Sequence, residues 1–240
     1  MRIFVGFDDT DTLDCGRGTG KLARWYTDKL PDGCLSLGVI RQQLLFSPEI
    51  PMTSHNSSLC VVVDAPDASY VSPLVSIATD HIREHFFEGS DPGLCVVEAS
   101  NPVISQLALF GLRCTYEKVS VEEAVKVAEG CHLSGHGGTN MGMIGAAAAV
   151  GLTWKGDSGR FVDWKDIREL DEITTVEEIT ARGITLFSVN RHGEIPAPGE
   201  MVNNYGSLRP RLFCGRVILP VISDGAGCWN TIIEKRSYSQ

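Results

Sequence analysis

The sequence predicts an α+β fold in which a ferredoxin-like N-terminal part packs against a second α/β part. The first hundred residues have the order β-α-β-β-α-β, which is the split βαβ pattern of ferredoxin-like folds. From about residue 101 the rhythm changes, and glycine-rich loops alternate with helices. The length of 240 residues, 43% of them hydrophobic, fits one large globular domain or two small ones.

Each element of the N-terminal part has its own signal. Short β-branched and aromatic runs predict strands, and apolar residues on one face predict helices. A Pro-Asp-Gly turn at 31–33 ends the first helix, and the Ser-Pro pair at 72–73 favours the start of the second. The expected strands are 2–7, 34–46, 59–65 and 93–99, and the expected helices are 19–30 and 70–86.

The rest of the chain is expected to form two further parts. Residues 101–112 and 120–130 look helical, and Ser120 stands three residues before Glu123, the spacing of a capping box. An Ala-rich helix follows at 143–152, then short helices or turns, a strand at 184–192, and two or three short strands. The predicted domains are 1–100, a ferredoxin-like half with an Asp-rich motif; 101–192, an α+β half with a glycine loop; and 193–240, a β-rich C-terminal extension.

Charge and composition narrow the class of protein. The net charge of −9 should repel nucleic acid, and the loose basic cluster Arg209, Arg211 and Arg216 is interpreted as a solvated face. No signal peptide or membrane span is predicted, so the expected location is cytoplasmic. None of the eight cysteines forms a Cys-x-x-Cys pair, which argues against a zinc ribbon.

Asp8, Asp9 and Asp11 stand where the first strand ends. Carboxylates this close repel one another unless a cation or hydrogen-bond donors neutralise them. Mg²⁺ prefers such oxygen ligands and takes one or two carboxylates together with phosphates. The alternative is an Asx-type turn or a helix cap. Three carboxylates within four residues favour the metal.

The glycine run at 16–21 is not a Walker A loop. That motif has four residues between its first Gly and the Gly-Lys pair, whereas Gly16 leaves three before Gly20 and Lys21. Glycines still allow close backbone approach, and a helix N-terminus attracts anions. Gly16, Gly18 and Gly20 are therefore candidate phosphate contacts.

A second glycine loop, at 135–142, also leads into a helix. Gly138, Asn140 and Gly142 are candidate nucleotide contacts there, and a long turn is the alternative. His81 and His85 are four residues apart on a predicted helix, but no His-Glu-x-x-His motif accompanies them. They are interpreted as surface or interface residues.

The opening residues Gly-Phe-Asp-Asp-Thr-Asp-Thr (6–12) and Gly-Arg-Gly-Thr-Gly-Lys-Leu-Ala (16–23) resemble the start of the archaeal agmatinylcytidine synthetases that act on isoleucine tRNA, the TiaS family. That family begins with a strand, then Gly-apolar-Asp-Asp-Thr-Asp-Ser, then a Gly and a Thr leading into Leu-Ala. Further segments keep the same order, and the likeness covers roughly 1–190. They are 44–58, 99–102, 138–151 and, more weakly, 184–193.

The resemblance implies a kinase-like domain that uses ATP and Mg²⁺ without a Walker loop. It implies that Asp8, Asp9 and Asp11 hold the metal and that Thr19 is phosphorylated during the reaction. It further implies activation of a cytosine carbonyl by phosphoryl transfer, after which the amine of agmatine displaces phosphate. The sequence departs from the family in reading Thr53-Ser54-His55-Asn56 where the family has Lys-Thr-Arg-Gly-Asn. Because the 240 residues contain no Cys-x-x-Cys pair, the family's zinc ribbon and oligonucleotide-binding part are not expected in them.

The resulting hypothesis is an ATP- and Mg²⁺-dependent enzyme, kinase- or ligase-like, that activates a small substrate for attack by an amine. Lys21 would neutralise charge on the transferred group. Two alternatives remain open: a tRNA-modifying ligase subunit that relies on separate RNA-binding chains, and an inactive protein that binds or senses a small molecule. Nucleic acid is not the favoured partner, no membrane is involved, and the oligomeric state stays open.

Overall fold

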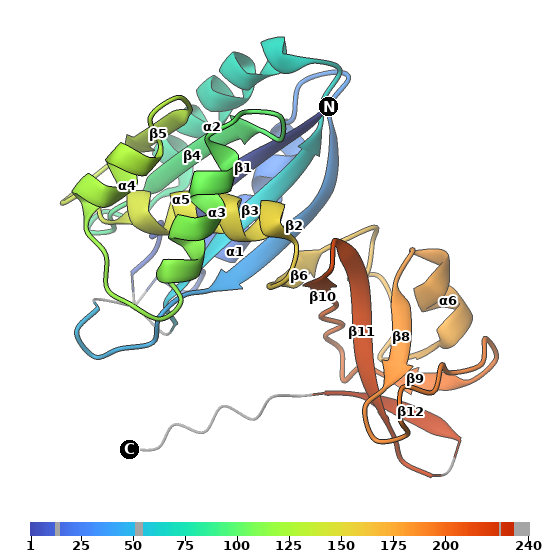
Figure 1. Ribbon diagram of the computed structural model, residues 1–240. Coiled ribbons are helices and arrows are strands. Elements are labelled where there is room, and N and C mark those ends of the chain that lie inside the picture. The colour runs from blue at the N-terminus through green and yellow to red at the C-terminus, as the bar shows by residue number, and fades with distance from the viewer. Residues whose placement is uncertain (13–14, 51–54, 226, 233–240) are drawn as a thin grey trace.

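The computed structural model describes residues 1–12, 15–50, 55–225 and 227–232, which form two lobes (Figure 1). The N-terminal lobe comprises residues 1–155 and the C-terminal lobe residues 156–232. The helices are α1 (Thr19–Tyr26), α2 (Val71–His85), α3 (Ile104–Arg113), α4 (Val121–Val127), α5 (Gly142–Lys155) and α6 (Val176–Ala181). Short 3₁₀ turns at Thr27–Lys29 and Ala68–Tyr70 follow α1 and precede α2.

The strands of the described residues form one continuous hydrogen-bonded sheet. Those of the N-terminal lobe are β1 (Arg2–Asp8), β2 (Leu35–Gln43), β3 (Ser57–Asp64), β4 (Gly93–Glu98) and β5 (His132–Gly135). Those of the C-terminal lobe are β6 (Arg160–Asp163), β7 (Ile173–Thr175), β8 (Thr185–Ser188), β9 (Met201–Asn203), β10 (Arg211–Phe213), β11 (Arg216–Ser223) and β12 (Cys228–Thr231).

The predicted ferredoxin-like arrangement is confirmed. The first four strands have the order β4-β1-β3-β2, and every neighbouring pair is antiparallel. Both split βαβ units thus enclose one strand of the other. Strand β1 lies in the middle, so the aspartates at its C-terminal end emerge from the centre of the sheet.

Helices cover both faces of this sheet, which explains why β1 is apolar at nearly every position. Ile3, Val5 and Phe7 share a buried cluster with α1 and α2. Phe4 belongs to the opposite cluster, with α3, α4 and α5. Side chains alternate between the faces of a strand, so a strand buried on both sides needs a continuous apolar run.

Helix α5 approaches the sheet closely because its inward residues are glycine and alanine. A Cβ on Gly6 of β1 would lie 2.2 Å from the carbonyl oxygen of Ala146. That separation is far below van der Waals contact, so the packing requires glycine at this position. The same close approach brings the N-terminal turn of α5 beside the end of β1.

The C-terminal lobe is joined to the first by strand pairing. Strand β6 pairs with β2 on one side and with β10 on the other. A third buried cluster, which includes Trp229, Val221 and Ile179, forms the core of this lobe and extends to Ile40 of β2. The three-part domain division expected from the sequence stays a prediction.

Several expected elements differ in detail. The two or three strands expected after residue 193 are four, β9 to β12. His81 was expected at the surface or at an interface and is instead buried within the protein, with 3% of its surface exposed, because its face of α2 packs against α1. The capping box of Ser120 and Glu123 is confirmed at the start of α4. Within the described residues, none of the helices is both long and apolar enough to cross a bilayer.

Candidate functional site

Several of the candidate residues predicted from the sequence line one cavity. A cavity of about 110 Å³ lies at the end of β1, and we call it the acidic cavity. Its lining includes Asp8, Asp9, Asp11, Thr19, His55, Lys118, Gly142 and Gly145. These residues come from β1, the loop after it, α1, the turn before β3, the segment after α3, and α5. The volume suits a phosphate group and its immediate partners, because pockets for whole cofactors reach about 300 to 1,000 Å³.

Thr19 and Asp11 form a hydroxyl–carboxylate pair at the edge of this cavity. The hydroxyl of Thr19 donates to Asp11 Oδ1 over 2.8 Å, and its amide N–H donates to the same oxygen over 2.9 Å. Thr10 completes the arrangement, since its hydroxyl lies 3.1 Å from Thr19 Oγ1. Thr19 is the first residue of α1, so Asp11 also neutralises the positive end of that helix.

The other two carboxylates are electrostatically strained. Burial, and next the charge of Asp9, holds the pKa of Asp8 well above its usual range. Burial raises the pKa of Asp9 to about 6, with further contributions from the charges of Asp91 and Asp11. Carboxylates of raised pKa gain most from a cation, because it compensates both desolvation and mutual repulsion.

Gly145 of α5 is the reason that Asp8 fits beneath the helix. A Cβ at position 145 would lie 1.8 Å from Asp8 Oδ2. The carboxylate therefore occupies the space that a side chain on α5 would fill. The glycine-rich start of α5 is part of the site because it leaves room for this carboxylate.

The aspartates can bind Mg²⁺ only if phosphate oxygens and waters complete its coordination shell. Among the described residues, the ligand atoms of the aspartates do not form a group within 4.8 Å of one another, whereas those of His81, Glu84 and His85 do. Mg²⁺ commonly uses one or two carboxylates and completes its shell with phosphate oxygens and waters. Asp8 and Asp9 can supply those one or two ligands, while one oxygen of Asp11 already binds Thr19.

The predicted phosphate-binding glycines are placed less centrally. Gly142 lines the acidic cavity, whereas Gly16, Gly18 and Gly20 are not among its lining residues. Gly18 is the N-cap residue of α1 and lies behind Asp11, because a Cβ there would be 3.8 Å from Asp11 Oδ2. Lys21 points elsewhere, with its ammonium 5.0 Å from the centre of the Trp25 ring.

The second glycine loop is held by a residue that sequence reasoning missed. The carboxylate of Asp91 accepts the amide N–H groups of Thr139, Asn140 and Met141. Gly138 and Asn140 both adopt positive φ, as this turn requires, and both are exposed outside the cavity lining. Its place in a Ser-Asp-Pro-Gly turn was the one signal for Asp91, since Asp in turns often accepts backbone N–H groups.

Next to the acidic cavity is a much larger inter-lobe groove of about 940 Å³. His55 lines both. The three residues Arg41, Arg160 and Arg211 line the groove and stand in register on β2, β6 and β10, so they share one face of the sheet. We call them the arginine row. Phe187, Phe213, Leu212, Ile218 and Pro220 are among the apolar residues of the groove.

The arginine row is unusual in an acidic chain. Like charges directly opposite each other destabilise a sheet, so this alignment has an electrostatic cost. Arg41 donates to the hydroxyl of Ser57 over 2.8 Å, which orients it on β2. From the sequence, Arg211 is interpreted as part of a solvated basic face, and in the structure Arg211 lines the inter-lobe groove. Thr53 and Ser54 of the expected loop lie outside the described residues.

Comparisons with known proteins agree with this geometry. No family model and no curated protein matches the chain. Among solved structures, it matches apo TiaS, a tRNA agmatidine synthetase, with 26% identity over 63% of this chain and a TM-score of 0.52. The chain is similar to TiaS.

Two complexes of TiaS match over more of the chain. The complex of TiaS with an isoleucine tRNA and ATP matches with 26% identity, 75% coverage and a TM-score of 0.56. The complex of TiaS with an isoleucine tRNA, AMPCPP and agmatine matches with 26% identity, 75% coverage and a TM-score of 0.55. The chain spans 35%, 43% and 44% of these three TiaS chains, less than half of each. The expected resemblance of the chain to TiaS is thereby confirmed.

Proposed function

We propose that this protein is an ATP-dependent enzyme that activates a carbonyl-bearing substrate by phosphoryl transfer and then joins it to an amine. The observation that supports it best is the pairing of Thr19 with Asp11 in a cavity that also contains Asp8 and Asp9. Similarity to the structures of TiaS in complex with ATP, and with an ATP analogue and agmatine, supports the same chemistry.

We assign the roles of the residues on the basis of their contacts. Asp8 and Asp9 would hold Mg²⁺, which would offset charge on the phosphates of ATP. Asp11 accepts the proton of Thr19 and so makes its oxygen a better nucleophile toward the γ-phosphorus. The phosphoryl group moves to Thr19 as ADP leaves, and then to the carbonyl oxygen of the substrate. The amine nitrogen attacks the activated carbon, and inorganic phosphate departs.

Room for a substrate comes from the inter-lobe groove. The acidic cavity is too small for a nucleotide, but the groove begins on the other side of His55. Gly16, Gly18, Gly20 and the turn at Gly138 to Gly142 would approach the phosphates from the two helix N-termini. Lys21 would have to leave Trp25 to take the charge-neutralising role expected for it.

A decisive test uses Mg²⁺, ATP and substitution of the aspartates. Asp8→Asn and Asp11→Asn should weaken Mg²⁺–ATP binding at least about tenfold, or about 1.4 kcal/mol, by isothermal titration calorimetry. Asp28→Asn is the matched control, since Asp28 is exposed in the 3₁₀ turn after α1. If the Asp8 and Asp11 variants bind as the wild type does, the proposal is wrong.

Phosphorylation of Thr19 has a separate test. Incubation with Mg²⁺ and ATP should add one phosphate to Thr19, detected by mass spectrometry of peptides. Thr19→Val has nearly the same shape and no hydroxyl, so the label should vanish, whereas Thr19→Ser should retain it. A phosphate found on another residue in the wild type would refute this role.

RNA is the second candidate for the substrate. The arginine row favours it, as do the TiaS complexes with an isoleucine tRNA, whereas the net charge of −9 opposes it. The two substrates can be separated by comparing turnover of a free cytidine nucleotide with turnover of a short RNA, each supplied with agmatine. Exclusive use of the RNA would make this chain a tRNA-modifying ligase.

A further inference from the structure

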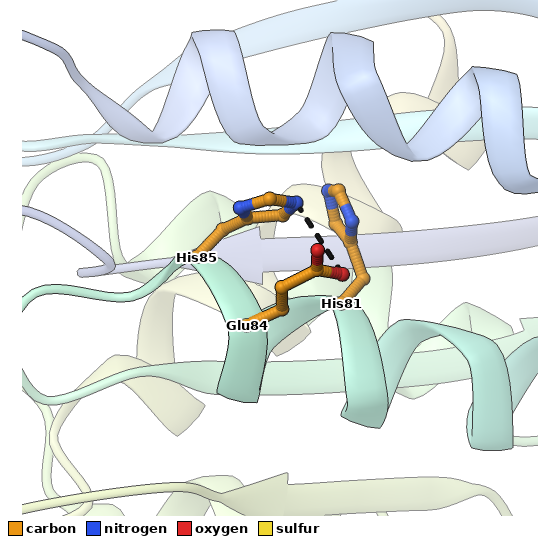
Figure 2. A group of neighbouring side chains, drawn as sticks. All are labelled: His81, Glu84 and His85. Atoms are coloured by element: carbon orange, nitrogen blue, oxygen red, sulfur yellow. Dashed lines mark ion pairs between the residues drawn. The ribbon is translucent and has the colours of Figure 1, made fainter.

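The last two turns of α2 carry a group of potential metal ligands that the proposed reaction does not use. One ligand atom each from His81, Glu84 and His85 lies within 4.8 Å of the others. Glu84 and His85 stand three and four positions after His81, so each is a neighbour of His81 on the helix surface. Figure 2 shows the two imidazole rings turned toward each other, with the Glu84 carboxylate beside them.

His81 is already oriented as a ligand. Its Nε2 lies 2.9 Å from the carbonyl oxygen of Leu22 on α1, and a carbonyl oxygen can only accept. Nε2 therefore bears the proton, and Nδ1 keeps a free lone pair. A histidine that binds metal commonly donates its second N–H to a backbone carbonyl, which fixes the ring and its tautomer.

The free nitrogen of His81 also lacks any other explanation. Only 3% of the residue is exposed, and Nδ1 has no hydrogen-bond partner among the described residues. An unsatisfied buried acceptor costs about 1 to 3 kcal/mol. A cation that accepts this lone pair would remove that cost, which makes Nδ1 an observation independent of the clustering.

The other two ligands leave a path for the ion. The side chain of Glu84 is 62% exposed and that of His85 is 24% exposed, so the group is buried on the α1 side and open on the other. His85 Nε2 lies 3.6 Å from Glu84 Oε2, a separation that a shared cation can span. Two imidazoles, one carboxylate and an open position suit Zn²⁺, whereas Mg²⁺ prefers an all-oxygen shell.

We propose that His81 Nδ1, His85 and Glu84 bind one zinc-type divalent cation at the end of α2. The site is distinct from the acidic cavity but joined to it through the backbone. Arg17 of the glycine run donates to the carbonyl of His85, and the segment after α2 is tied to the aspartate loop by the bonds Phe87 N to Thr10 O and Asp91 N to Asp9 O.

The test is Zn²⁺ titration of the chelator-treated full chain, by calorimetry and by melting temperature. We expect one Zn²⁺ per chain and a rise in melting temperature, because the ion binds the folded state. His85→Asn and Glu84→Gln should each weaken binding about tenfold or more and leave Mg²⁺–ATP binding intact. His192→Asn, at an exposed position remote in sequence, is the control. His81→Asn is unsuitable alone, since the ring also contacts α1.

Cobalt substitution then identifies the ligand atoms. Co²⁺ bound here should show no thiolate-to-metal charge-transfer band, although the chain contains eight cysteines. The proposal is overturned if wild type does not bind Zn²⁺, if the His85 and Glu84 variants bind it equally well, or if the thiolate band appears. None of these results bears on the aspartates, so failure here leaves the ATP hypothesis standing.

Discussion

At the scale of single residues, the acidic cavity is defined by the carboxylates of Asp8, Asp9 and Asp11, which the fold holds close together. Asp9 adopts a left-handed backbone conformation with φ of 48°, which turns the chain sharply after β1. The turn brings its carboxylate near Asp11 and Asp91, whose charges help raise its pKa. The site is therefore destabilising in itself and gains when a cation binds.

This raised pKa predicts how stability depends on pH. Asp9 titrates at about 6 when folded and at about 3.9 when unfolded, so the folded state holds a proton that the unfolded state has released. The free energy of unfolding should fall, on the order of 1 to 2 kcal/mol, as pH rises from about 4 to about 6. Urea denaturation at several pH values in this range should show that the free energy of unfolding changes less with pH for Asp9→Asn than for the wild type. Asparagine is the suitable replacement because it tolerates the same left-handed backbone. An equal pH dependence of stability in the two proteins would contradict the raised pKa of Asp9.

Gly145 gives a second prediction at this scale. Gly145→Ala places a methyl group 1.8 Å from Asp8 Oδ2, so Asp8 or α5 must move. We expect a loss of about 1 to 3 kcal/mol in stability by denaturant unfolding, together with weaker Mg²⁺–ATP binding. The matched control is Gly199→Ala, because no atom lies within 4 Å of that position and its φ is not positive. If the Gly145→Ala variant is as stable as the wild type, the site can accommodate the added methyl group and the prediction is wrong.

At the scale of elements, two helix N-termini point toward the aspartate loop, and each is satisfied by a carboxylate. Asp11 accepts from the first residue of α1, and Asp91 accepts from three amides before α5. Helix N-termini attract anions because their N–H groups lack partners within the helix. A phosphate entering the site would compete for donors that these carboxylates now use.

Asp91→Ala should therefore destabilise the start of α5. The loss of one acceptor for three amides should cost about 1 to 2 kcal/mol, whereas Asp91→Asn keeps one oxygen and should cost less. Thermal unfolding measures both. Asp67→Ala removes an exposed cap elsewhere, from Ser69, and should leave Mg²⁺–ATP binding unchanged. If Asp91→Ala is as stable as the wild type, water replaces the carboxylate without a loss of stability.

At the scale of the whole molecule, strand pairing places the two lobes around the inter-lobe groove. The path β3-β2-β6-β10-β11 runs from one lobe into the other and aligns the arginine row. The groove combines cationic side chains with an apolar wall, a combination that suits a phosphate next to a ring. Its position beside the acidic cavity is consistent with the proposal that one substrate reaches both.

Removal of an arginine from the row should weaken binding of any phosphate-bearing substrate. For a short RNA measured by fluorescence anisotropy, Arg160→Ala or Arg211→Ala should lower affinity and reduce the slope of log K against log salt by about 1. Arg83→Ala is the control, since its side chain is 70% exposed on α2. If the Arg160 and Arg83 variants behave alike, the groove does not bind phosphate.

The sequence by itself determined the fold of the first hundred residues, the capping box of Ser120 and the resemblance to TiaS. These rest on local patterns, namely strand and helix periodicity, cap spacing and one short motif, which neighbouring residues fix without tertiary contacts. Tertiary structure alone decided that Asp8 fits beneath Gly145, that Asp91 holds the second glycine loop, and that Arg41, Arg160 and Arg211 align. It also buried His81 against Leu22 of α1, because which side of α2 faces the core depends on an element far away in the chain. Such pairings depend on how distant segments pack, and no local pattern encodes them.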